Sequence, residues 1–165
     1  MATADILYGT AASLTMTLAS LASDTNLSTG RQSAARDNST ALDIDDLVGG
    51  IITASTLATV AGLQAEVWLA GSYDGTTYSA GASGTDSAFS PGSKKTLLKL
   101  LTIIPFTTLA AATPMQWGPF SVAQAFGGVI PQKWSVFIVH NSSAALNASS
   151  SLHEVKYTPI NFTSA

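Results

Sequence analysis

The densest group of ionisable side chains in this sequence is an acidic cluster formed by Asp43, Asp45 and Asp46. Grouped carboxylates can bind a hard cation, but this spacing does not match the acidic loop of a calcium site. On a strand, Asp43 and Asp45 share one face, where like charges repel each other unless a cation lies nearby. Arg31 and Arg36 come from the segment just before. We interpret these residues as ion-pair or interface charges and predict no metal site.

A second group is aromatic, because Trp68, Tyr73 and Tyr78 surround an Asp74-Gly75 pair. Asp-Gly supplies the positive φ angles that a type I′ turn needs, so this segment predicts a β-hairpin. Aromatic rings around such a turn can stack on a sugar, although they are also common cross-strand partners in sheets. These three residues are the best candidates for a ligand or interface site, with packing as the competing role.

Residue types that carry out catalysis are scarce. The chain has no cysteine, two histidines and only 10% charged residues, whereas enzymes draw nucleophiles and bases mainly from these types. Neither His140 nor His153 has further ligands at metal-binding spacing, and no nucleophile elbow, phosphate-binding glycine loop or dinucleotide fingerprint is present. We therefore predict no catalytic residue, no cofactor and no enzymatic activity.

The elements that would position these side chains are short β-strands. Residues 134–139 are apolar on both faces, which is typical of a central strand covered on each side. Apolar and polar residues alternate at 42–45, and Asp46 and the Gly49-Gly50 pair then break this pattern. Further strands are predicted at 14–18, 51–60, 65–69, 97–108, 118–122 and 153–157, the last ending near Pro159. About eight short strands predict an all-β fold, a β-sandwich or jelly-roll-like single domain over residues 1–165.

Composition also indicates how the chain is organised. The stretch 23–40 is too polar for a core and is predicted to be a long loop or arm, so residues 1–40 are expected to form an assembly region. The uncharged stretch 47–65 is diluted by Gly and Thr, and 100–115 is interrupted by Pro105, so both are expected to be sheet. With a net charge of −3, we predict neither a membrane nor a nucleic-acid partner.

Five parts of the sequence share a further pattern. They are ASLTMTLASLAS at 12–23 followed by GRQS at 30–33, WLAGSYDGTTY at 68–78, GPFSVAQAFGG at 118–128, IPQKW at 130–134 and the His-x-Val-x-Tyr ending at 153–157. Together they resemble a group of small structural virion proteins of tailed bacteriophages. None of them is a mechanistic motif. The resemblance implies a decoration or cement protein on the phage head, and it implies no catalytic residue.

The same resemblance implies partners and a location. The expected partner is the major capsid protein, with self-association as a trimer at local threefold positions, on the capsid surface of the virion. Because no basic residue precedes Leu14, no positively charged signal segment is expected and synthesis is placed in the host cytoplasm. An arm that adds a strand to a neighbouring sheet would supply adhesion. The alternative is a carbohydrate-binding or tail- or fibre-associated β module that uses the three aromatic residues.

Overall fold

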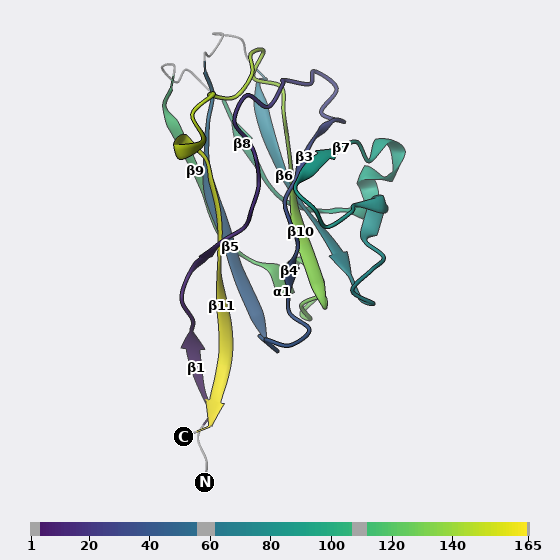
Figure 1. Cartoon of the computed structure of the whole chain (residues 1–165), viewed down its shortest axis with the longest axis vertical. Helices are drawn as coiled ribbons and strands as arrows, with labels where there is room; N and C mark the ends of the chain where they lie inside the picture. The colour runs from purple at the N-terminus through teal and green to yellow at the C-terminus, as the bar shows by residue number, and fades with distance from the viewer. Residues whose placement is uncertain (1–3, 56–61, 107–111, 165) are drawn as a thin grey trace.

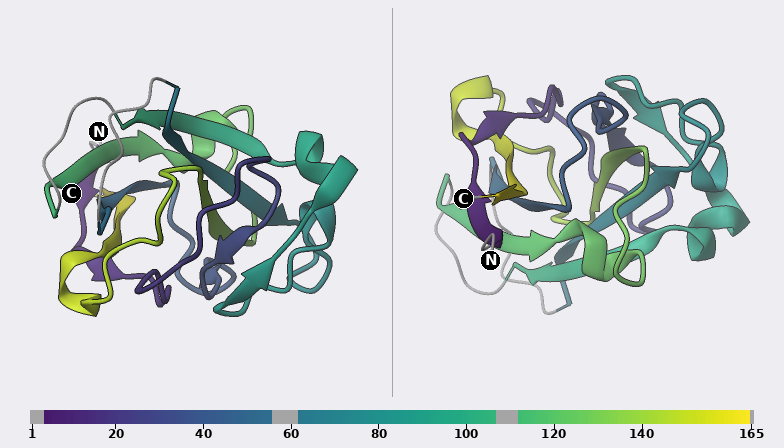
Figure 2. Two further views of the ribbon diagram at one scale, coloured as in Figure 1. Left: turned by 90° about the horizontal axis from the view of Figure 1, so that it is seen from above. Right: turned by 90° about the horizontal axis from the view of Figure 1, so that it is seen from below.

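The chain folds into two antiparallel β-sheets that pack against each other (Figure 1, Figure 2). The structure is a computed structural model that describes residues 4–55, 62–106 and 112–164. Sheet A contains, in spatial order, β1 (Ala4–Tyr8), β11 (Glu154–Ser164), β5 (Asp45–Thr53) and β9 (Pro114–Ser121), and β2 (Ala12–Ser13) also pairs with β11. Sheet B contains β7 (Ser87–Phe89), β3 (Gly30–Gln32), β10 (Lys133–His140), β6 (Gln64–Ser72) and β8 (Lys99–Pro105), and β4 (Arg36–Asp37) also pairs with β10.

Helical segments are short and lie between the strands. They are α1 (Val122–Ala125) and three 3₁₀ helices, η1 (Ser79–Gly81), η2 (Gly92–Leu97) and η3 (Ser150–Leu152). The predicted all-β, sandwich-like fold class is confirmed, although the described residues form eleven strands instead of about eight.

Strand β10 lies in the middle of sheet B and is covered on both faces. Trp134, Val136 and Ile138 point into the main core between the two sheets, whereas Phe137 and Val139 join a second apolar cluster on the outer face of sheet B. Every residue from 134 to 140 is buried. Because apolar side chains on both faces of a strand require cover on both sides, the prediction of a central strand at this position is confirmed.

The predicted strand at 14–18 is wrong as hydrogen-bonded structure, although its pattern of burial is correct. Leu14 and Leu18 are buried, but the segment forms no ladder with another strand. It is fixed instead by isolated backbone bonds, such as the one from the N–H of Leu14 to the carbonyl of Val155 at 2.8 Å. Apolar alternation therefore reports which side chains face the core, and pairing depends on the neighbouring chain.

Part of the polar stretch 23–40 belongs to sheet B. Strands β3 and β4 lie within it and both pair with β10. Its polar residues are buried because they find partners: the Ser33 hydroxyl accepts the N–H of Val136 at 3.0 Å, and the Gln32 amide donates to Ser83 at 2.6 Å. Buried polar groups are stable only with such partners.

Strand β5 runs through the Gly49-Gly50 pair, where the sequence predicts a break. At Gly50, a Cβ atom would lie only 2.1 Å from the carbonyl oxygen of Glu154 on the neighbouring strand. The close approach of β11 therefore requires glycine inside this strand. The segments predicted at 65–69, 97–108 and 118–122 correspond to β6, β8 and β9.

The Asp74-Gly75 segment forms a turn but not a hairpin. Asp74 Oδ1 accepts the backbone N–H groups of Thr76 and Thr77 at 2.8 and 2.6 Å, and Gly75 has a φ of +73°. However, β6 pairs with β10 and β8, and the chain continues from this turn into η1. The hydrogen bonds of an aspartate turn are therefore present. The segment that follows the turn does not form the second strand of the predicted hairpin.

Within the described residues, no helix has the length and apolar character needed to cross a bilayer. The stretches 47–65 and 100–115 contribute to β5, β6, β8 and β9 where they are described. Residues 56–61 and 107–111 lie outside the described residues, and they include parts of the strands predicted at 51–60 and 97–108.

Candidate functional site

Asp43, Asp46 and Arg36 form a buried network that joins the two sheets. Arg36 Nη2 donates to Asp43 Oδ2 at 2.5 Å, and Arg36 Nε lies 3.7 Å from Asp46 Oδ2. The same Asp46 oxygen accepts a hydrogen bond from Trp134 Nε1 at 2.8 Å. The guanidinium also lies over the ring of Tyr157, 4.8 Å from its centroid. Arg36 and Trp134 belong to sheet B and Asp46 to sheet A, so these contacts hold the sheets together.

Burial in this segment is the reverse of what its alternation predicts. Leu42 and Ile44 are 75% and 38% exposed, whereas Asp43 and Asp46 are 6% and 0% exposed. The Asn38 side chain fixes this arrangement, since it accepts the backbone N–H of Asp43 at 2.8 Å and donates to its carbonyl at 3.0 Å. Specific polar partners inside the sandwich therefore outweigh the burial of two apolar side chains.

Asp46 is the titratable group most changed by its surroundings. Burial raises the pKa of Asp46 to about 6, against the opposing effects of the Trp134 hydrogen bond and the Arg36 charge. Among the described residues, nothing hydrogen-bonds to Asp46 Oδ1. One guanidinium faces two carboxylates here, and the carboxyl group of Asp46 is fully buried. These contacts place the Asp46 carboxyl group inside the sandwich, away from solvent.

The other two candidate charges have separate partners. Asp45 accepts the N–H of Ala123 at 2.7 Å and the hydroxyl of Ser121 at 2.6 Å, which fixes the start of α1. Arg31 pairs with Asp86 at 2.6 Å and does not reach the acidic cluster, because β3 lies beside β7. The residues described by the structure contain no group of three His, Cys, Asp or Glu arranged to hold a metal ion.

The three candidate aromatic residues do not form one platform. Trp68 Nε1 donates to Glu66 Oε2 at 2.9 Å, and the amine of Lys95 lies 4.9 Å from the centroid of the Trp68 ring. Tyr73 is 78% exposed, whereas Tyr78 packs against the outer apolar cluster of sheet B. Across the described part of the chain, no ring contact joins any two of these three side chains.

The two histidines have structural partners. His140 is buried, with Nε2 3.0 Å from the carbonyl of Leu21 and Nδ1 2.9 Å from the Ser142 hydroxyl. Because a carbonyl only accepts, Nε2 carries the proton, and burial lowers the pKa of His140. His153 Nε2 lies 2.8 Å from the carbonyl of Asn147.

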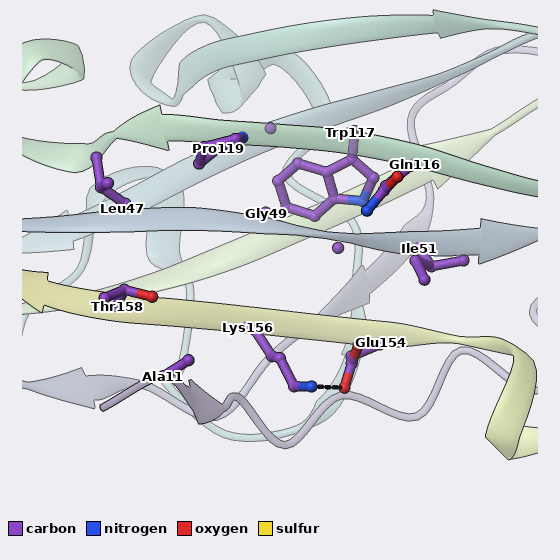
Figure 3. Close-up of a pocket in the computed structure, with 12 residues that line it drawn as sticks. Ala11, Leu47, Gly49, Ile51, Gln116, Trp117, Pro119, Glu154, Lys156 and Thr158 are labelled. Carbon is purple, nitrogen blue, oxygen red and sulfur yellow. Dashed lines mark ion pairs between the residues drawn. The ribbon is translucent and has the colours of Figure 1, made fainter. Parts of the chain in front are cut away.

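The outer face of sheet A carries a hollow of about 240 Å³ (Figure 3). Gly49 and Gly118 leave this part of the sheet without side chains. On β11, Glu154 and Lys156 point toward one another and form an ion pair, so they neutralise each other. Trp117 lines the hollow but is only 5% exposed, and it offers no open ring face for stacking. The described residues of this lining contain one carboxylate, which excludes a carboxylate pair at this place.

An exposed apolar surface lies on a two-stranded ribbon at one end of the molecule (Figure 1). We call residues 4–8 of β1 and 160–164 of β11 the terminal ribbon. It projects beyond the sandwich at the end where both chain termini lie (Figure 1). The register places Ile6 opposite Phe162 and Tyr8 opposite Ile160, and opposite residues of antiparallel strands share a face. Ile6, Tyr8 and Phe162 are 61%, 63% and 60% exposed.

The terminal ribbon also has open edges. β11 continues through Pro159 to Ser164, beyond the predicted end of this strand. Its pairing with β5 stops at Ile160, which faces Asp45, so the last residues of β11 pair only with β1 in the described structure. β1 has β11 as its one partner strand there. The terminal ribbon therefore offers backbone N–H and C=O groups on both sides, together with one apolar face.

Comparison of the chain with family models, with curated proteins and with solved structures finds no match. The function is therefore inferred from the sequence pattern and from the geometry of these surfaces.

The terminal ribbon is the candidate surface that sequence reasoning missed. Its signal was present as two short alternating segments, with Ile6 and Tyr8 near one end of the chain and Ile160 and Phe162 near the other. Neither segment identifies the other as its partner, because pairing across the whole chain is a property of the fold. The assembly contact expected in residues 1–40 stays a prediction, and β1 lies within this segment.

Proposed function

We propose that this chain is a structural protein of a tailed-bacteriophage virion, a decoration or cement protein that binds and stabilises the head shell. The resemblance of its segments to small phage virion proteins supplies the class. The major capsid protein is the proposed partner, and the capsid surface is the proposed location. The terminal ribbon is the single structural observation that carries the proposal.

The terminal ribbon suits attachment to a protein lattice. An exposed apolar patch on a soluble domain marks an interaction site when it is contiguous, and Ile6, Tyr8 and Phe162 lie on one face of two paired strands. Full burial of each such side chain contributes about 1.5–3 kcal/mol. Open strand edges add backbone hydrogen bonds to a neighbour without special side chains.

The body of the sandwich supports the same proposal. Its buried charges are engaged with each other, as at Arg36 and Asp46, and the hollow beside Gly49 has charged side chains that neutralise one another. The described residues thus present contacts that hold a rigid module together and a protruding apolar ribbon that can bind a partner.

Copy number in purified particles tests this proposal. Quantitative mass spectrometry would measure the chain against the major capsid protein of the same particles. A decoration protein is expected at a level comparable to the capsid protein or at a fixed fraction of it. A few copies per particle would contradict a shell-covering role and favour the tail or fibre alternative, and absence from particles would overturn the virion assignment.

A further inference from the structure

Among the residues that the structure describes, three charged side chains make no ion pair and no side-chain hydrogen bond. The described residues include every Asp, Glu, Lys and Arg of the chain. All of these except Asp5, Lys94 and Lys99 make an ion pair or a side-chain hydrogen bond, as the acidic cluster, Asp24 and Asp74 illustrate. The three exceptions are all exposed. In a chain with only 10% charged residues, their positions are informative.

The unpartnered charges lie beside open strand edges of opposite sheets. Asp5 belongs to β1, which is one of the two edge strands of sheet A and part of the terminal ribbon. Lys99 is the first residue of β8, one of the two edge strands of sheet B, and Lys94 lies in η2 just before it. In the described structure β8 pairs only with β6. The unpartnered acidic side chain is therefore on the β1 edge, and the unpartnered basic side chains are at the β8 edge.

Both edges are also apolar. On β8, Leu100 and Ile103 are 45% and 46% exposed, and Leu97 before it is 58% exposed. On the terminal ribbon, Ile6 and Tyr8 lie on the same strand as Asp5, and their side chains are 61% and 63% exposed. Exposed apolar edge strands pair with other chains unless they are covered, and natural proteins usually protect them. The β1 edge and the β8 edge thus each combine exposed apolar side chains with backbone N–H and C=O groups that have no partner strand in the described structure.

We propose that the β1 edge of one copy pairs with the β8 edge of a second copy, with Asp5 placed beside the Lys94–Lys99 end of β8. The contact is heterologous, because two different surfaces meet, and repetition of such a contact closes a ring or continues as an open array. Three copies closing a ring would give the expected trimer. If instead two β1 edges met, or two β8 edges met, the unpartnered side chains of one copy would find no opposite charge among those of the other copy. This inference deepens the proposed function, on which its place in the virion rests.

The test uses charge reversal in the full chain with analytical ultracentrifugation. The wild-type protein is expected to associate with increasing concentration. Asp5→Lys and Lys99→Asp are each expected to weaken association about tenfold or more, because like charges then meet at the contact. The double variant Asp5→Lys/Lys99→Asp restores the opposite pairing and is expected to recover association. Glu154→Lys is the matched control, since it makes the same charge change on the outer face of sheet A.

The outcomes separate this inference from the proposed function. A wild-type protein that stays monomeric at millimolar concentration overturns the β1–β8 contact, even if the protein covers the shell of purified particles. Single reversals that leave association unchanged, or a double variant that does not recover, also overturn it. Loss with each single reversal and recovery in the double variant, with normal thermal unfolding throughout, supports the contact whatever the copy number in particles.

Discussion

Strand β11 passes through two environments, one of buried contacts and one of exposed apolar surface. Its first part, with Val155 only 3% exposed, pairs with β5 on one side and contacts β2 on the other. Its last part pairs only with β1, and Phe162 is 60% exposed. One continuous strand is thus part of the sandwich body at one end and of a protruding ribbon at the other. Buried contacts are concentrated in the first region and exposed apolar surface in the second.

The largest expected effect compares two aromatic residues, one from each region. Trp134 is fully buried and bonded to Asp46, so Trp134→Ala is expected to lower the free energy of unfolding by about 3–5 kcal/mol. Phe162→Ala on the terminal ribbon is expected to change it by less than about 0.5 kcal/mol. Urea unfolding monitored by circular dichroism measures both. Similar losses in the two variants would contradict the division between body and ribbon.

A second comparison concerns ion pairs. Arg36→Met leaves Asp43 and Asp46 buried without their cation and is expected to cost about 3 kcal/mol at neutral pH. Lys156→Met removes the exposed pair with Glu154 and is expected to cost less than about 1 kcal/mol. Denaturant midpoints at one pH rank the two variants. An Arg36 variant as stable as the Lys156 variant would mean that the buried network does not hold the sheets together.

Asp46 predicts a dependence of stability on pH. Its folded pKa of about 6 lies above the ordinary value of 3.8, so the folded state holds the proton more tightly. The free energy of unfolding is therefore expected to fall as pH rises from 4 to 6, by about 2–3 kcal/mol from this group. His140 acts in the opposite direction, because burial lowers its pKa and acid then favours the unfolded chain.

The difference between wild type and Asp46→Asn isolates this effect from that of His140. Asparagine keeps an acceptor for Trp134 and does not titrate. The stability of the wild type relative to the variant is expected to increase as pH is lowered through 6. A difference that does not change with pH would show that Asp46 keeps an ordinary pKa in the folded protein.

The smallest effect on stability is expected from the apolar face of the terminal ribbon. Ile6→Ser and Phe162→Ser replace side chains that are already mostly exposed, so each is expected to change the free energy of unfolding by less than about 0.5 kcal/mol. Thermal unfolding measures this, and a large loss would mean that the terminal ribbon supports the body of the sandwich.

Periodicity predicted the elements whose burial follows directly from their own residues. The strand at 134–139 is apolar on both faces and is central, and 65–69 alternates and is paired on both sides. The same reasoning failed at 42–46, where Asn38 and Arg36 turn the aspartates inward and leave Leu42 exposed. The alternation of residues within one segment does not show which polar side chains of other segments will bind to it.

The candidate site was less predictable than the fold for the same reason. The pairing of Arg36 with Asp43 could be predicted, because the two opposite charges lie in neighbouring segments of the sequence. Arg31 pairs with Asp86, which is far away in the sequence and could not be predicted from it. The terminal ribbon joins residues from the two ends of the chain, with Ile6 opposite Phe162. A pattern in a short stretch of sequence does not show that residues so far apart in the chain pair with each other. The apolar face of the terminal ribbon can therefore be recognised only in the folded structure.

Binding of ribbon variants to phage particles that lack the protein tests the central claim most directly. Sedimentation of particles with added Ile6→Ser/Phe162→Ser protein measures occupancy. Tyr73→Ser is the control, at a more exposed aromatic residue outside the terminal ribbon. The account predicts that wild type and the Tyr73 variant saturate the shell, while the ribbon variant binds at least about tenfold more weakly. Equal occupancy by the ribbon variant would contradict the account.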